Sequence, residues 1–234
     1  MIEVLSARAF WCAPDEKILW CHPLEYTAGK AGYVYYQVSG LDERGDKRWT
    51  AGKVIGGVAS GVAGLALEAI SPTDEASGNP GIPKAVVSGQ SRDCLAASQL
   101  GAWQATGVNG KSGREFIWIL TSHRLGLLES SAKESESVAG LLGGLKKKIS
   151  GGSDEQGGSP LRAVQLPTLT VHAEFPRNII ANVSTVEYKV KGKERKFLRV
   201  SLVDGSTLDL TARGESMQSA DTVDRLLAMT FGQV

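Results

Sequence analysis

The stretch Phe116-Ile117-Trp118-Ile119-Leu120-Thr121-Ser122-His123-Arg124-Leu125 decides the fold that we predict for this chain. A run of apolar residues ends in the polar turn 121–124, and residues 125–128 are again mostly apolar. This pattern is typical of two antiparallel strands joined by a tight turn. His123 is interpreted as a residue of that turn.

The sequence after Pro167 continues in the same way, because apolar and polar residues alternate with a period of two in 186–190 and again in 198–202. Asp204-Gly205 supplies the positive φ values of a tight hairpin turn, and residues 208–210 return the chain to the same core. Segment 219–231 carries an apolar stripe and is followed by Gly232, which predicts a closing helix.

At these residues the chain resembles the bacterial pleckstrin-homology-like (PH-like) domains. The resemblance rests on the strand, Thr121-x-x-Arg124 turn and strand of 116–125, on Phe175-Pro176-Arg177-Asn178-Ile179, and on residues 202–206. It covers residues 115–232. It implies an α+β, mainly β fold, in which a C-terminal helix caps a bent antiparallel sheet or half-barrel, in a family used mostly for binding and scaffolding.

The chain is predicted to divide into residues 1–113 and residues 114–234. The first part would hold N-terminal strands, near 15–21 and 32–38, a long Gly/Ala-rich helical insertion, and a short helix at 90–103. The second would be the PH-like domain, with a mobile loop at 130–160 that is rich in Ser, Gly and Glu.

Residues 52–70 form the Gly-rich apolar segment of this insertion. Its glycines recur four apart, which would let another backbone approach closely. The apolar run is shorter than the roughly 20 residues that a membrane-spanning helix needs. Two interpretations stay open, namely a tightly packed core helix or hairpin, and a segment that inserts into a partner or a membrane surface. Trp49, just before it, suits a membrane interface.

A basic amphipathic helix is predicted at 137–150. Its apolar residues recur at helical spacing, and three lysines cluster near its C-terminal end, where positive charge suits the helix dipole. Such a helix can lie on an anionic membrane, occupy a partner's groove or fold back onto the protein's own sheet. The candidate membrane or partner contacts are therefore Lys146, Lys147, Lys148, Leu141, Leu142, Leu145 and Trp49.

A second basic cluster surrounds the predicted turn at 191–193 and is relieved only by Glu194. It is either a solvated face or a contact for phosphate or lipid headgroups. The residues of this basic hairpin are Lys189, Lys191, Lys193, Arg195 and Lys196.

Composition and motifs do not favour an enzyme. The 26 Lys and Arg balance 25 Asp and Glu to a net charge of +1, so general nucleic-acid binding is not favoured either. Gly110-Lys111-Ser112 does not make a phosphate-binding loop, because position 105 is Ala where that motif requires Gly. The three histidines are far apart in sequence, and no nucleophile or metal motif accompanies them. We therefore predict no cofactor, no metal and no catalytic residue.

The sequence thus predicts a non-catalytic binding or scaffold module that acts by association with another protein or with itself. Three cysteines and an N-terminus without a signal-like pattern favour a cytoplasmic protein. The alternative is a peripheral membrane protein on the inner face of the membrane, held by helix 137–150 and segment 52–70.

Overall fold

The computed structural model describes residues 2–24, 34–43, 45–47, 83–105, 115–131, 166–190, 193–211 and 217–233. The fold is mainly β, with two sheets and a few helices. In chain order the elements are α1 (Ile2–Phe10), β1 (Ile18–Leu24), β2 (Val34–Val38), β3 (Ala85–Gly89), α2 (Leu95–Ala105), β4 (Glu115–Thr121), β5 (Arg124–Ser131), β6 (Thr168–Pro176), the short 3-10 helix η2 (Arg177–Ile179), β7 (Ile180–Val190), β8 (Lys193–Leu202), β9 (Thr207–Thr211) and α4 (Met217–Thr230).

The first sheet is an antiparallel meander with the strand order β1-β4-β5-β6. Its central hairpin, β4–β5, is the one predicted from 116–128, and Leu120 pairs with Leu125 across the turn. We call these four strands sheet 1.

The second sheet, sheet 2, has the order β2-β3-β9-β8-β7. The β8–β9 hairpin confirms the predicted turn, where Gly205 has a φ of +80°. Strands β2 and β3 run parallel to each other, and β3 joins β9 in antiparallel register. They therefore extend the β7–β8–β9 meander at one edge.

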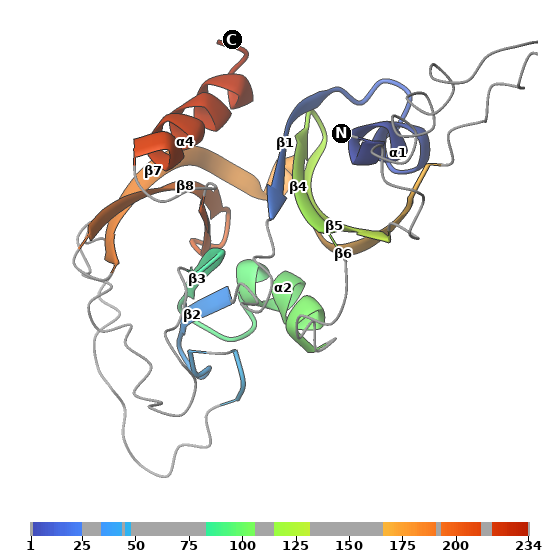
Figure 1. Cartoon of the computed structure of the whole chain (residues 1–234). Coiled ribbons are helices and arrows are strands. Elements are labelled where there is room, and N and C mark those ends of the chain that lie inside the picture. The colour runs from blue at the N-terminus through green and yellow to red at the C-terminus, as the bar shows by residue number, and fades with distance from the viewer. Residues whose placement is uncertain are drawn as a thin grey trace, which may run out of the picture.

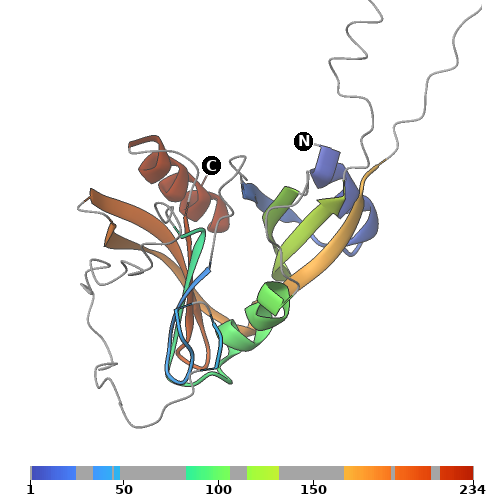
Figure 2. The same ribbon diagram turned by 60° about the horizontal axis from the view of Figure 1, so that its bottom comes forward.

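The main core lies between the two sheets. Its buried side chains come from both sheets and from α2 and α4, and Figure 1 shows these two helices packed beside the sheets. Figure 2 shows α2 at the end of the molecule where the two sheets come together. From β4, the inward-facing residues are Phe116, Trp118 and Leu120. The alternate residues of the two predicted strands also face this core, as their alternation predicted; they are Leu198, Val200, Leu202, Leu208 and Leu210.

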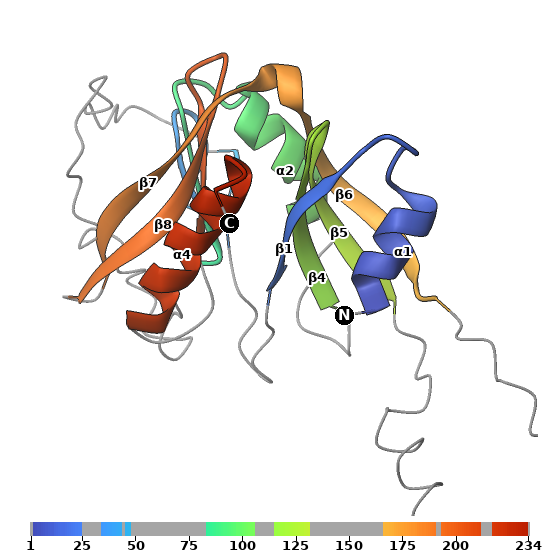
Figure 3. The same ribbon diagram turned by 90° about the horizontal axis from the view of Figure 1, so that it is seen from above.

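Helix α1 covers the opposite face of sheet 1, as Figure 3 shows. Ala7 of α1 is fully buried against Ile117 and Ile119 of β4 and Leu128 of β5. Both faces of β4 are therefore covered, and this explains why residues 116–120 are apolar without alternation.

Two hydrogen bonds tie β1 of sheet 1 to the other half of the molecule. The indole Nε1 of Trp20 donates to Oγ1 of Thr230 in α4 over 2.9 Å, and Nε2 of His22 lies 3.1 Å from the carbonyl oxygen of Thr211 in β9. The first strand is thus part of the shared core.

Several predicted elements differ from the structure in their limits. Helix α2 begins at Leu95, five residues later than predicted, and α4 begins at Met217 instead of Ser219. Helix α1 and strand β3 were not predicted. The Gly-rich segment 52–70, helix 137–150 and the loop at 130–160, apart from its first two residues, lie outside the described residues. Among the helices that the structure does describe, none is long and apolar enough to span a bilayer.

Candidate functional site

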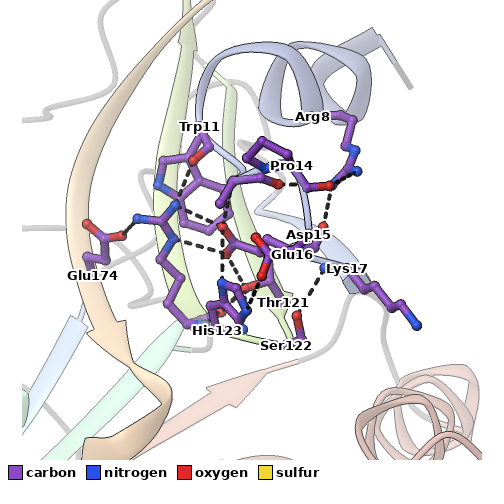
Figure 4. A network of polar contacts seen from close by, with 12 residues as sticks. Arg8, Trp11, Pro14, Asp15, Glu16, Lys17, Thr121, Ser122, His123 and Glu174 are labelled. Carbon is purple, nitrogen blue, oxygen red and sulfur yellow. Dashed lines mark hydrogen bonds and ion pairs between the residues drawn. The ribbon is translucent and has the colours of Figure 1, made fainter.

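The turn between β4 and β5 is the centre of the largest polar network in the described part of the chain. Arg124 Nε donates to Oε1 of Glu16 over 3.0 Å, and its Nη2 donates to Oε2 of the same carboxylate over 2.9 Å. Nη2 also donates to the carbonyl oxygen of Trp11 over 2.7 Å, and Nη1 pairs with Glu174 of β6. Figure 4 shows Trp11 and Glu16, which both belong to the loop between α1 and β1, together with Glu174 of β6. We call this set the Arg124 network.

Glu16 is fully buried, so its charge depends on these partners. The hydroxyl of Thr121 donates to Oε1, and the N–H of Ala13 donates to Oε2 over 2.9 Å. Burial by itself raises the pKa of Glu16, but the hydrogen bonds from Arg124, Thr121 and Ala13 outweigh it and lower the pKa to about 2. Glu16 is therefore ionised at neutral pH.

Thr121 and Arg124 also shape the turn itself. Thr121 Oγ1 accepts the N–H groups of His123, over 3.1 Å, and Arg124, over 3.0 Å. This is the usual way in which a threonine stabilises a tight turn. Because the Thr121 hydroxyl and the Arg124 guanidinium both donate to Glu16, the Thr and Arg positions of the Thr121-x-x-Arg124 turn also bind the loop between α1 and β1.

Trp11 completes the network through close packing. The guanidinium carbon of Arg124 lies 4.6 Å from the centre of the Trp11 ring, within cation–π range. On β5, a Cβ atom at Gly126 would lie 2.5 Å from Cζ2 of Trp11. Only glycine therefore lets the indole ring lie this close to the strand.

The outer segment of the network involves Arg8 and His123. Arg8 donates to the carbonyl oxygens of Pro14, over 2.9 Å, and of Glu16, so that it closes the loop after α1. His123 is half-exposed, with Nε2 3.7 Å from Oδ2 of Asp15. Each of these contacts stabilises the loop that joins α1 to β1, so the network positions α1 on sheet 1.

A second buried network crosses sheet 2 on the face away from the main core. Arg199 Nε and Nη2 each donate to a different oxygen of the Asp209 carboxylate over 2.7 Å, and Nη2 also contacts the Tyr188 hydroxyl at 2.7 Å. The Tyr188 hydroxyl donates to the same carboxylate. Asp209 is fully buried. Burial, together with the Asp209 charge, raises the pKa of Tyr188, which therefore stays protonated at neutral pH.

The residues of the basic hairpin lie on β7 and β8, where the register sets acidic residues beside them. Lys189 is opposite Glu194, and Glu187 is opposite Lys196. Lys196 also pairs with both carboxylate oxygens of Asp224 in α4, at 2.7 and 2.8 Å. Carboxylates therefore lie beside two of the five basic residues, Lys189 and Lys196.

The other members of the predicted sites are only partly described. Arg195 is half-buried opposite Tyr188, and the structure describes only the backbone of Lys193. The remaining candidate residues lie outside the described residues, so their contacts stay predictions; they are Lys191, Trp49, Leu141, Leu142, Leu145, Lys146, Lys147 and Lys148.

The three histidines lie apart, with His22 on β1, His123 in the β4–β5 turn and His172 on β6. His172 is the extra residue of a bulge in β6, and its Nε2 lies 2.6 Å from Oε2 of Glu129 in β5. Burial raises the pKa of the Cys21 thiol to about 11, which keeps it protonated and poorly nucleophilic at neutral pH. Within the described ranges, no group of three or more potential metal ligands is present.

Sequence reasoning identified Thr121 and Arg124 but missed their partners Trp11, Glu16 and Glu174. Glu16 had no distinguishing signal, because an acidic residue in a polar turn is usually exposed. Asp209 had none either, because a polar residue that alternates with leucines in a strand usually faces solvent. The structure buries it beside Arg199 and Tyr188 instead.

Comparison with known proteins gave no match to a family model, to a curated protein or to a solved structure.

Proposed function

We propose that this chain is a non-catalytic binding or scaffold module of the bacterial PH-like type, acting by protein–protein association. The order of its elements supports the proposal. Leaving aside β2, β3 and α2, the chain forms a four-stranded meander (β1, β4, β5, β6), a three-stranded meander (β7, β8, β9) and then α4. Antiparallel strands followed by a closing C-terminal helix are what the resemblance to PH-like domains implies.

In this proposal β2, β3 and α2 are an insertion between the first and second strands of the PH-like unit. The insertion extends sheet 2 by pairing β3 with β9. The N-terminus of α2 is held by the hairpin of that sheet, because Asp204 accepts the N–H of Leu95 over 2.7 Å. The added elements therefore share the core of the unit and leave its two meanders intact.

The basic hairpin is the partner contact that we propose to test first. Affinity capture from cells would compare the wild-type chain with a variant carrying Lys189→Glu and Lys193→Glu. Lys17→Glu with Arg92→Glu is the matched control, because both of these side chains are exposed and lie on other elements. A partner retained by the wild type and the control but lost by the hairpin variant supports the proposal. Equal capture of a partner by all three proteins would show that the basic hairpin is not the partner-binding surface.

Peripheral membrane association is the second candidate, and the basic, amphipathic sequence 137–150 favours it. Flotation of the purified chain with anionic and neutral vesicles, at low and moderate salt, tests it. Salt-sensitive binding to anionic vesicles that is lost on replacing Lys146, Lys147 and Lys148 by Ala would establish this function. Absence of binding to both kinds of vesicle at both salt concentrations would reject membrane association. Protein–protein association would then remain as the proposed function.

A further inference from the structure

Strand β7 is the longest of the four strands that lie at the edge of a sheet, and within the described ranges it pairs only with β8. The other edges are tied down or interrupted. Side-chain contacts of Trp20 and His22 join β1 to α4 and β9. The N–H of Tyr36 in β2 donates to the carbonyl oxygen of Glu43, and a bulge interrupts β6. A regular edge strand presents backbone N–H and C=O groups that can pair with a strand of another molecule.

The part of β7 from residue 182 to residue 190 is regular, because its register with β8 shifts only before it. Figure 3 shows β7 running from the junction of the two sheets to the margin of the molecule that lies away from sheet 1. One face of this part carries three apolar residues of a cluster outside the main core, Val186, Tyr188 and Val190. Glu187 and Lys189 alternate with them and are exposed. The end of β7 therefore has one apolar face and one charged face.

We propose that this end of β7 is the interface of a symmetric dimer, in which the β7 strands of two copies pair antiparallel with Tyr188 on the two-fold axis. With that axis, Glu187 of each copy lies opposite Lys189 of the other copy, and Val186 lies opposite Val190. A single register therefore pairs opposite charges on one face and apolar side chains on the other, and both kinds of cross-strand pair are stabilising.

Neighbouring registers lack this complementarity. A two-fold axis perpendicular to the sheet keeps each face of the strand on the same side in both copies, so the axis must pass through a residue position. An axis at Glu187 would set the two glutamates opposite each other, and an axis at Lys189 would do the same with the lysines. Like charges directly opposite each other are destabilising. The charges of β7 therefore select the axis at Tyr188.

The helices leave room for the pairing. Helix α4 packs mainly on β8, where Asp224 pairs with Lys196. In the dimer, three strand spacings, or about 14 Å, would separate the two β8 strands. A helix with its side chains is about 10–12 Å across, so the two α4 helices would fit side by side. The pairing involves only residues 186–190, so the interface is smaller than that of most permanent dimers and the dimer should depend on concentration.

This inference names a second copy as a partner and so rests on the proposed function of protein–protein association. Sedimentation equilibrium of the full chain at low salt, over a series of concentrations, tests it. The mass of the wild type should rise from one copy toward two. Glu187→Lys and, separately, Lys189→Glu should each weaken the dimer by about tenfold or more, because each sets like charges opposite each other at two positions. Lys17→Glu with Arg92→Glu is the matched control and should dimerise like the wild type, because both side chains are exposed and lie on other elements.

A mixture of the two single variants guards against a general effect of the substitutions on folding. Glu187→Lys leaves two lysines at these positions and Lys189→Glu leaves two glutamates, so the equimolar mixture should form a mixed dimer in which every lysine faces a glutamate. Misfolded variants would not regain association on mixing. A wild type that stays monomeric, single variants that dimerise as tightly as the wild type, or a mixture that stays monomeric would each overturn the proposal.

Affinity capture separates this inference from the proposed function. A monomeric wild type that still captures another protein through the basic hairpin would refute the dimer and leave the proposed function in place. A monomeric wild type that captures no protein would count against both.

Discussion

Replacement of Arg124 by Met should destabilise the fold by about 3 kcal/mol. Breaking a buried ion pair by removing one partner typically costs about 3–5 kcal/mol, because the remaining charge stays buried without its partner. Glu16 is that remaining charge, and its side chain is fully buried. Arg124 is 26% exposed, so the lower end of the range applies. The substitution also removes the hydrogen bond to the Trp11 carbonyl and the contact with the Trp11 ring.

The shifted pKa of Glu16 gives a similar magnitude. A tenfold change in an ionisation constant corresponds to about 1.4 kcal/mol, so lowering the pKa from 4.5 to about 2 represents roughly 3 kcal/mol of preference for the charged form. Because the folded-state pKa lies below the unfolded one, this stabilisation is complete above about pH 5 and is lost as the pH falls toward 2. Arg124→Met should therefore flatten the acid side of the stability profile.

Urea-induced unfolding at pH 7 and at several values down to pH 3 is the assay. Arg8→Met is the matched control, because Arg8 belongs to the same region but donates to carbonyl oxygens, and it should cost about 1 kcal/mol. Glu16→Gln should reproduce the flattened acid profile, and combining it with Arg124→Met should add much less than the sum of the two losses. If Arg124→Met costs no more than Arg8→Met, or if Glu16→Gln leaves the acid profile unchanged, the reasoning about this network is wrong.

Three further substitutions test other contacts. Gly126→Ala should cost about 1–3 kcal/mol in urea unfolding, because the added methyl group meets the Trp11 ring, whereas Gly101→Ala meets nothing within 4 Å and should not destabilise; equal effects would contradict the packing. Tyr188→Phe should cost about 1 kcal/mol by removing a hydroxyl that donates to a buried carboxylate, and a neutral result would mean that this bond contributes nothing. Asp204→Ala should cost about 1 kcal/mol and speed hydrogen exchange in the first turn of α2, whose N-terminus it holds; unchanged exchange there would disprove that role.

The candidate sites illustrate what a sequence pattern can miss. The basic hairpin looks like a concentration of positive charge when the lysines and arginines are counted along the chain. The register of β7 with β8 sets Glu187 and Glu194 opposite two of them, and α4 brings Asp224 to Lys196. The net charge of the surface around a strand includes the residues that lie opposite it on neighbouring elements. Strand register and the position of α4 determine which residues those are, and neither can be inferred from the hairpin sequence alone.

The sequence by itself determined the elements whose signals are local. The β4–β5 hairpin follows from two apolar runs and a polar turn, the β8–β9 hairpin from alternation around Asp204-Gly205, and α4 from its apolar stripe. Each of these depends on contacts between residues close together in the chain, so a short window contains most of the information.

Only the tertiary structure decided the relations between distant segments. Glu16 and Arg124 are 108 residues apart in sequence, and β3 pairs with β9 across a similar separation. Helix α1 gave no signal because its fully buried residues, Ser6 and Ala7, are small, while Leu5 and Phe10 are exposed. A buried carboxylate is stable only where the fold brings a cation and hydrogen-bond donors to it, and that depends on the packing of the whole chain and not on the residues beside Glu16.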